Sequence, residues 1–236
     1  MSTRTMGKLL CCACLLVAAS IASAQPTQRY FDDIGRIYCV EGAERYLPGD
    51  YYFCVANKAL QQGKARKARA MFEESANWGD KRAMFNLGLL LVRGEGMPKD
   101  EPLGLAWLAL SAERSKDQLQ RETLVSAWSA ATPETRDAAN ALWNSMKLKY
   151  ADRVVLPRAQ QRYERETSRL RVALQFDPFM KIELAGVGHP WGGTKAMQLL
   201  DEAANETILW PLPNQKGEVI IGNPETVREP AKDAGD

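Results

Sequence analysis

The sequence predicts a mainly α-helical protein, in which a repeat array of stacked α-α hairpins is followed by a small C-terminal α+β appendage. Two observations predict the array. Residues 28–150 divide at Gly and Pro-Gly turns into helix-length segments, and two of those segments share one pattern 36 residues apart (104 − 68). The third observation concerns residues 179–222, where short alternating apolar and polar stretches flank one helical stretch and predict the appendage.

The first 24 residues are expected to be a signal peptide. Two basic residues precede an almost unbroken apolar run over residues 9–21, and Ala22-Ser23-Ala24 supplies the small side chains of a cleavage site. The run is shorter than the roughly 20 residues that a membrane-spanning helix needs. We therefore expect a mature chain that begins at Gln25, is periplasmic or secreted, and has no stable membrane insertion.

Removal of the signal peptide changes the cysteine and charge arguments. Three of the five cysteines lie in it, so Cys39 and Cys54 remain, and a pair in an oxidising compartment is expected to form a disulfide. Two of the 31 basic residues and none of the 29 acidic ones are lost, which leaves 29 against 29. A neutral chain gives no electrostatic reason to expect nucleic acid or an anionic membrane as a partner.

The region 25–150 is predicted as a series of helices joined by tight turns. Its first segment carries an apolar stripe at helical spacing and ends at Pro48-Gly49-Asp50, where Asp50 is a candidate cap for the next helix. Asp100 is a candidate cap for a later one, ahead of Pro102. We expect these later helices at residues 51–62, 64–78, 81–92 and 102–115.

Two of these helices carry the internal repeat. One hairpin cannot bury its apolar face alone, so a repeat of this length predicts stacked hairpins that share a core. Small side chains in the pattern allow neighbouring helices to approach, and large apolar ones fill the space between hairpins. Phe72 and Trp107 are therefore expected in the core. The first copy consists of Ala68, Met71, Phe72, Ala76 and Gly79, and the second of Gly104, Trp107, Leu108, Ala112 and Ser115.

The same region resembles a known repeat family. A Leu-Gly pair precedes the loop, a Gly-x-Gly lies in it, and a Pro-x-Asp follows it. With these marks, residues 65–115 resemble the Sel1-like repeat family, which is related to tetratricopeptide repeats. Two loop glycines are expected to supply positive φ angles, and Gly88 to let two helices touch. The residues that carry the pattern are Ala68, Phe72, Ala76, Gly79, Ala83, Leu87, Gly88, Gly94, Gly96, Asp100 and Trp107.

The resemblance implies an α-α superhelical (Sel1-like, TPR-like) repeat array whose concave face contacts other proteins. Thr132-Pro133-Glu134 resembles the start of the capping helix that closes such arrays. Some exported relatives bind or weakly hydrolyse β-lactams, but they carry a disulfide in each repeat. Because this chain has a single candidate pair, that activity is not carried over.

The second half of the chain has weaker signals. Residues 151–178 are expected to be a charged helix or a linker, with an apolar stripe of Tyr163, Leu170, Val172 and Leu174. Residues 179–222 are expected to form the small α+β appendage, and residues 223–236 a disordered tail. Within the appendage the predicted elements are a strand at 180–185, a helix at 194–204, and a hairpin formed by 207–212 and 218–221.

A glycine-rich segment, residues 186–195, invites a phosphate-binding interpretation. The dinucleotide pattern fails because its third glycine would have to stand at Trp191, and the P-loop pattern fails because Thr194 and Lys195 are in the wrong order. His189 is the chain's single histidine, too few for the clusters usual in zinc sites. Trp191 and His189 are instead candidates for contact with a partner, unless Trp191 covers the appendage's own core.

The sequence therefore predicts no catalytic residue, no cofactor and no metal. The adjacent acids Asp32-Asp33 and Glu73-Glu74 point in different directions on a helix and are expected to be solvated. The predicted function is that of an exported, non-enzymatic scaffold or adaptor that binds another envelope protein through a helical repeat surface. Two alternatives stay open: an envelope hydrolase of the β-lactam or peptidoglycan type, and an inhibitor or immunity-type protein.

Overall fold

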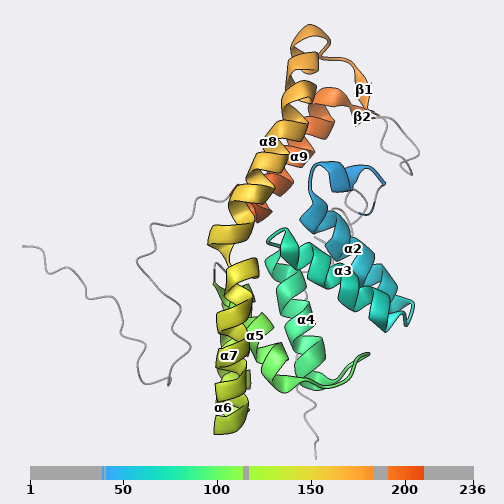
Figure 1. Cartoon of the computed structure of the whole chain (residues 1–236). Coiled ribbons are helices and arrows are strands. Elements are labelled where there is room, and N and C mark those ends of the chain that lie inside the picture. The colour runs from blue at the N-terminus through green and yellow to red at the C-terminus, as the bar shows by residue number, and fades with distance from the viewer. Residues whose placement is uncertain (1–38, 40, 114–116, 183–190, 210–236) are drawn as a thin grey trace, which may run out of the picture.

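The computed structural model describes residues 39, 41–113, 117–182 and 191–209, and this part of the chain is mainly helical (Figure 1). The predicted signal peptide, the predicted apolar stripe over residues 30–38, His189 and the predicted tail lie outside the described residues. No helix within the described ranges is long and apolar enough to cross a membrane. The helices are η1 (a 3-10 helix, Ala43–Arg45), α2 (Pro48–Gln61), α3 (Ala65–Asn77), α4 (Lys81–Arg93), α5 (Glu101–Ala112), α6 (Gln118–Ala130), α7 (Pro133–Tyr150), α8 (Asp152–Phe176) and α9 (Gly193–Thr207).

Caps explain where several of these helices begin and end. The Asp80 carboxylate accepts hydrogen bonds of 2.9 and 3.1 Å from first-turn amide groups of α4, and Gly94, with φ of 72°, ends that helix. The expected cap at Asp100 is confirmed, since its Oδ1 accepts from a first-turn amide of α5 at 3.1 Å. The expectation that Asp50 caps α2 is wrong. The helix begins at Pro48, so Asp50 lies inside its first turn and is buried.

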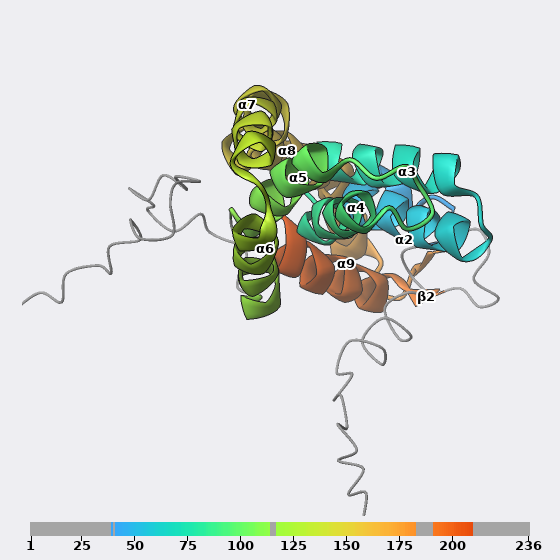
Figure 2. The same cartoon turned by 90° about the horizontal axis from the view of Figure 1, so that it is seen from below.

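The helices α2 and α3 form one hairpin, and α4 and α5 form a second hairpin packed beside it. The rings of Phe53 and Phe72 meet in the core at a centroid distance of 6.1 Å, and Trp107 is buried as expected. Gly88 lies against Gly104 where α4 crosses α5. The core of these hairpins comprises Phe53, Ala56, Ala59, Ala68, Phe72, Ala76, Ala83, Met84, Leu87, Leu91, Met97, Trp107 and Leu110. Figure 2 shows α6 and α7 at the end of the molecule opposite the α2–α3 turn.

The segment predicted as a charged helix or linker is the long helix α8, which continues from the end of α7 and lies beside α9 (Figure 1). Pro157 lies in its second turn without ending it. Leu156 and Tyr163 are buried against Leu47 and the inner face of α9, but Val172 does not join this stripe and is 52% exposed. Two helices from distant parts of the sequence therefore cover the first hairpin.

The region predicted as an appendage contains α9 and two very short strands, β1 (Lys181–Ile182) and β2 (Trp191–Gly192). They pair antiparallel, Lys181 opposite Gly192 and Ile182 opposite Trp191. The predicted strand beginning at Thr207 is wrong at its start, because Thr207 is the last residue of α9. Residues 210–222, with the rest of the predicted hairpin, lie outside the described part of the chain.

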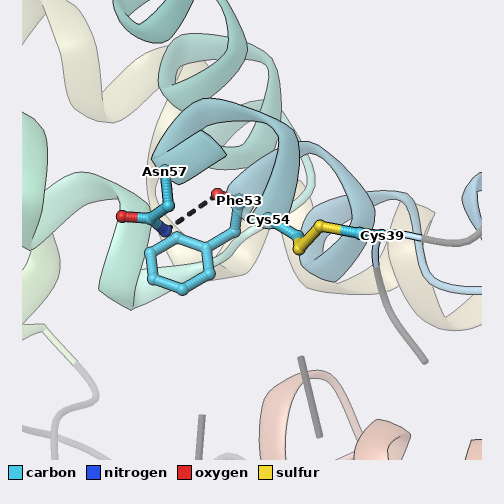
Figure 3. Close-up of a disulfide and its surroundings, with 4 residues drawn as sticks. All are labelled: Cys39, Phe53, Cys54 and Asn57. Atoms are coloured by element: carbon cyan, nitrogen blue, oxygen red, sulfur yellow. Dashed lines mark hydrogen bonds between the residues drawn. A yellow bond between two sulfur atoms is a disulfide. The ribbon is translucent and has the colours of Figure 1, made fainter. Parts of the chain in front are cut away.

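Cys39 and Cys54 form the expected disulfide, with their Cα atoms 5.4 Å apart. Figure 3 shows Cys54 pointing from α2 toward Cys39, while Phe53 points to the other side of the helix. The Asn57 amide donates a 2.9 Å hydrogen bond to the Phe53 carbonyl within the same turns. The disulfide thus joins the chain ahead of η1 to the helix that begins the first hairpin.

Candidate functional site: a basic groove between two hairpins

A cavity of about 680 Å³ opens between the α2–α3 turn and the connection from α4 to α5. Figure 1 shows both connections on the same side of the molecule, away from α8. One wall comes from the start of α3 and the other from the loop of the second hairpin. The lining residues are Gly63, Lys64, Ala65, Arg66, Lys67, Arg69, Gly96, Met97 and Pro98.

Two glycines shape the walls of this groove. Gly63 adopts φ of 69°, which lets the chain reverse after α2 and brings Lys64 to the start of α3. Gly96 adopts φ of 71° and lies over the end of α2, since a Cβ built on it would be 3.5 Å from Leu60 Cδ1. The next residue, Met97, is buried in the shared core and forms an apolar floor.

The charge in the groove is positive, because four basic residues and no acidic one line it. Arg66 and Lys67 are exposed and form no ion pair within the described residues. Arg69 Nε is held by Glu73 Oε1 at 2.9 Å, in an i,i+4 pair on the surface of α3. Lys64 Nζ donates to Gln62 Oε1 at 2.9 Å. Such exposed contacts are weak, so all four cations are available to an anionic group.

The acidic residues of the opposite loop do not neutralise the groove. Glu95 pairs with Arg93 at 3.9 Å, Glu101 pairs with Lys99 at 3.1 Å, and the Asp100 carboxylate caps α5, so each of these acids has a partner outside the cavity lining. The first turn of α3 holds no acidic side chain either. The groove can therefore attract carboxylates or other anions, with the planar guanidinium groups able to bind a carboxylate through two hydrogen bonds.

A second polar centre lies in the core beneath α9. The Arg82 guanidinium donates to Asp50 Oδ1 at 2.6 Å and also pairs with Asp80, while the Thr207 hydroxyl donates to Asp50 Oδ2 at 3.4 Å. Burial raises the pKa of Asp50 to about 6. The positive charge of Arg82 lowers this pKa, and the negative charge of Asp80 raises it further. For Arg82, burial lowers the pKa of the guanidinium, but the two carboxylates outweigh burial and raise it.

Carboxyl groups with a shifted pKa often mark functional sites, which makes this centre a candidate for chemistry. The cavity beside it measures about 10 Å³, which holds no more than about one water molecule. A substrate cannot reach Asp50 there. We interpret Asp50, Asp80, Arg82 and Thr207 as a buried polar lock that joins α2, the start of α4 and the end of α9.

The structure places the repeat-pattern residues in the core and in the turns between helices. Gly79, with φ of 85°, turns the chain between α3 and α4, and Gly94, Gly96 and Asp100 lie in the second hairpin's loop. Trp191 lies in β2, but its side chain and His189 are outside the described part of the chain. The buried pattern residues are Ala68, Phe72, Ala76, Gly79, Ala83, Leu87, Gly88 and Trp107.

Sequence reasoning missed the basic groove. Its signal was the run of four basic residues between positions 64 and 69, which on a helix usually marks a solvated face. Comparisons with protein-family models, with curated proteins and with solved structures found no match. In the described ranges no three or more His, Cys, Asp or Glu side chains gather as a metal site would require.

Proposed function

We propose that this chain is an exported, non-enzymatic scaffold of the Sel1-like type, which binds another envelope protein through the surface of its helical hairpins. One observation carries the proposal. Helices α3 and α5 carry the same residue pattern, displaced by 36 residues (104 − 68). Equivalent positions of the pattern, such as Phe72 and Leu108, are buried at the contacts between helices. Arrays of this kind present a continuous surface built for contact with partners rather than for chemistry.

The same proposal extends to the architecture. We take α2 to α5 as a short superhelical array that α6 and α7 close, and α9, β1 and β2 as the appendage, which α8 connects to the array. The polar lock and the cluster around Leu47 support this division of roles, because they hold α9 against the first hairpin. A fixed appendage would leave the α2–α3 turn and the α4–α5 loop free for a partner.

Export is supported by the N-terminal sequence and by the disulfide, which persists in oxidising compartments. The test is mass spectrometry of the protein purified from its native cell. The expected chain begins at Gln25 and carries no free thiol. An intact chain beginning at Met1 in the cytoplasmic fraction contradicts the export proposal.

The binding proposal is tested by site-specific crosslinking in the envelope fraction. A photoreactive amino acid at position 67 faces the groove, and one at position 169 on the exposed side of α8 is the control. We expect one defined protein to be crosslinked from position 67 and not from position 169, and to bind the purified chain with micromolar or tighter affinity. Failure of that purified protein to bind, or turnover of a β-lactam or peptidoglycan substrate by the chain alone, overturns the scaffold proposal.

A further inference from the structure

We infer that the basic groove binds an acidic, extended peptide segment of the partner protein. This inference rests on the proposed scaffold function and adds the chemistry of what is bound. Three features of the groove point to it: a positive wall from the start of α3, the absence of any acidic lining residue, and a floor formed by the buried side chain of Met97. Carboxylates meet the wall, and an apolar side chain of the peptide meets the floor.

The size of the cavity limits the ligand to a short segment. About 680 Å³ lies within the range of about 300–1,000 Å³ typical of sites that enclose a small ligand. A folded domain is too large to enter, whereas a few residues of extended chain fit. Their backbone can lie along Gly63 and Gly96, which line the groove and carry no side chains themselves.

The cations of the groove can accept a ligand without losing strong partners. Arg66 and Lys67 form no ion pair within the described part of the chain, so an incoming carboxylate does not have to break one there. The pair between Arg69 and Glu73 holds the Arg69 guanidinium at the edge of the wall. Attraction of this kind is screened by salt, so it acts mainly on the rate of encounter and on specificity.

Two other anionic partners fit the groove less well. A membrane is a flat surface and cannot enter a concave site. A single-stranded nucleic acid relies on aromatic side chains that stack with its bases, and none lines this groove. The formal charge of the whole chain is only +2, so no general attraction for polyanions assists either of them.

The experiment measures binding of a fluorescein-labelled peptide, Asp-Glu-Leu-Glu-Asp-Glu, to the full mature chain. The test variant is Arg66→Glu/Lys67→Glu, and the matched control is Arg153→Glu/Arg169→Glu, which makes the same charge change at two exposed positions on α8. We expect the groove variant to bind at least tenfold more weakly and the control less than twofold more weakly. All four positions are exposed, and circular dichroism checks that both variants melt like the wild type.

Several outcomes overturn the inference. Equally weakened peptide binding in both variants would show a general electrostatic attraction and no specific site. If the wild type does not bind the peptide at all, an acidic segment is not the ligand of the groove. Tighter binding of vesicles with an anionic lipid, or of an oligo-dT strand, assigns the groove to another class of partner.

The inference and the scaffold proposal can fail separately. If the crosslinked protein binds the groove variant with wild-type affinity, the acidic-segment inference fails while the scaffold proposal stands. If the peptide binds in the groove but the crosslinked protein does not bind the purified chain, the groove keeps its preference for acidic segments and the scaffold proposal fails.

Discussion

Gly88 and Gly104 face each other across the contact between α4 and α5 so closely that a Cβ atom built on either would lie 2.9 Å from the carbonyl oxygen of the other. A Cβ on Gly88 would also come within 2.8 Å of Leu108, and one on Gly104 within 2.7 Å of Val92. At this contact the backbones of α4 and α5 therefore meet directly, with the side chains of Leu108 and Val92 packed against the same two glycines. Backbone atoms cannot move aside as the end of a flexible side chain can.

Gly88→Ala is expected to destabilise the protein by about 1–3 kcal/mol, because the added methyl group must push α4 and α5 apart. The free energy of unfolding, measured in urea, tests this. Gly49→Ala is the matched control, since Gly49 also lies in a helix but a Cβ there would have ordinary contacts of 3.5 Å. The control is expected to be neutral or stabilising. Equal effects in the two variants would mean that the close approach of α4 and α5 is absent.

Trp107→Ala is expected to lower the free energy of unfolding by about 3–5 kcal/mol, because Trp107 is buried in the hairpin core. Its ring also packs edge-on against the ring of Tyr150, with 4.7 Å between the ring centroids. Trp107→Phe should cost clearly less. The indole N–H has no hydrogen-bond acceptor among the described residues, so Phe loses volume but no such bond. Thermal melting of both variants checks the order. A Trp107→Ala protein that melts at the wild-type temperature refutes the predicted packing.

Breaking the disulfide with Cys39→Ser/Cys54→Ser is expected to lower the free energy of unfolding by about 3 kcal/mol, the amount expected for closing a loop of 15 residues in the unfolded chain. Denaturation of the oxidised and the reduced wild type gives the same comparison. Reducing agent should lower the melting temperature of the wild type and leave that of the double variant unchanged. Two thiols labelled in the denatured, unreduced wild type would disprove the bond.

The raised pKa of Asp50 predicts a pH dependence of stability. The folded protein holds the Asp50 proton up to a pKa of about 6, whereas the unfolded chain releases it near 3.8. Between these values the folded state binds more protons, so the contribution of Asp50 to stability falls as the pH rises, by up to about 3 kcal/mol. Below about pH 4 this contribution is fully present.

Asp50→Asn isolates the effect of this one group. The Asn side chain has the same shape as that of Asp50, and its amide oxygen can still accept a hydrogen bond from Arg82. It does not titrate, because it has no carboxyl proton to release. We expect the difference in unfolding free energy between the wild type and the variant to change steadily from about pH 4 to about pH 6.5, with the wild type losing stability relative to Asn. Parallel pH curves for the two proteins would show that Asp50 titrates at an ordinary pKa.

Local signals in the sequence predicted the helical part of the fold well. Gly and Pro mark turns through their own backbone preferences, and Asp100 caps a helix through a bond to a residue three positions away. The positive φ angles expected at Gly94 and Gly96 are present for the same reason. Such effects act within a few residues, so they can be recognised without knowledge of the rest of the fold.

The groove and the polar lock depend on contacts between distant residues, which one sequence does not reveal. Asp50 follows Pro48-Gly49 as a cap would, but its partner Arg82 is 32 residues away on another helix. The helix α8 is ambiguous in the sequence for a related reason. Its buried side chains, such as Leu156 and Tyr163, are sparse among charged residues. Their role in the core is recognisable only once α9 is known to pack beside them.

The position of α8 has a consequence for how the chain is made. The guanidinium groups of Arg158 and Arg162 on α8 each lie 5.1 Å from the centre of the Trp78 ring. Leu156, also on α8, belongs to the same buried cluster as Leu47. During translation, Trp78 is synthesised 78 residues before Leu156 (156 − 78). The early hairpins therefore emerge with an uncovered apolar edge, and a growing chain needs protection from aggregation until α8 has been synthesised.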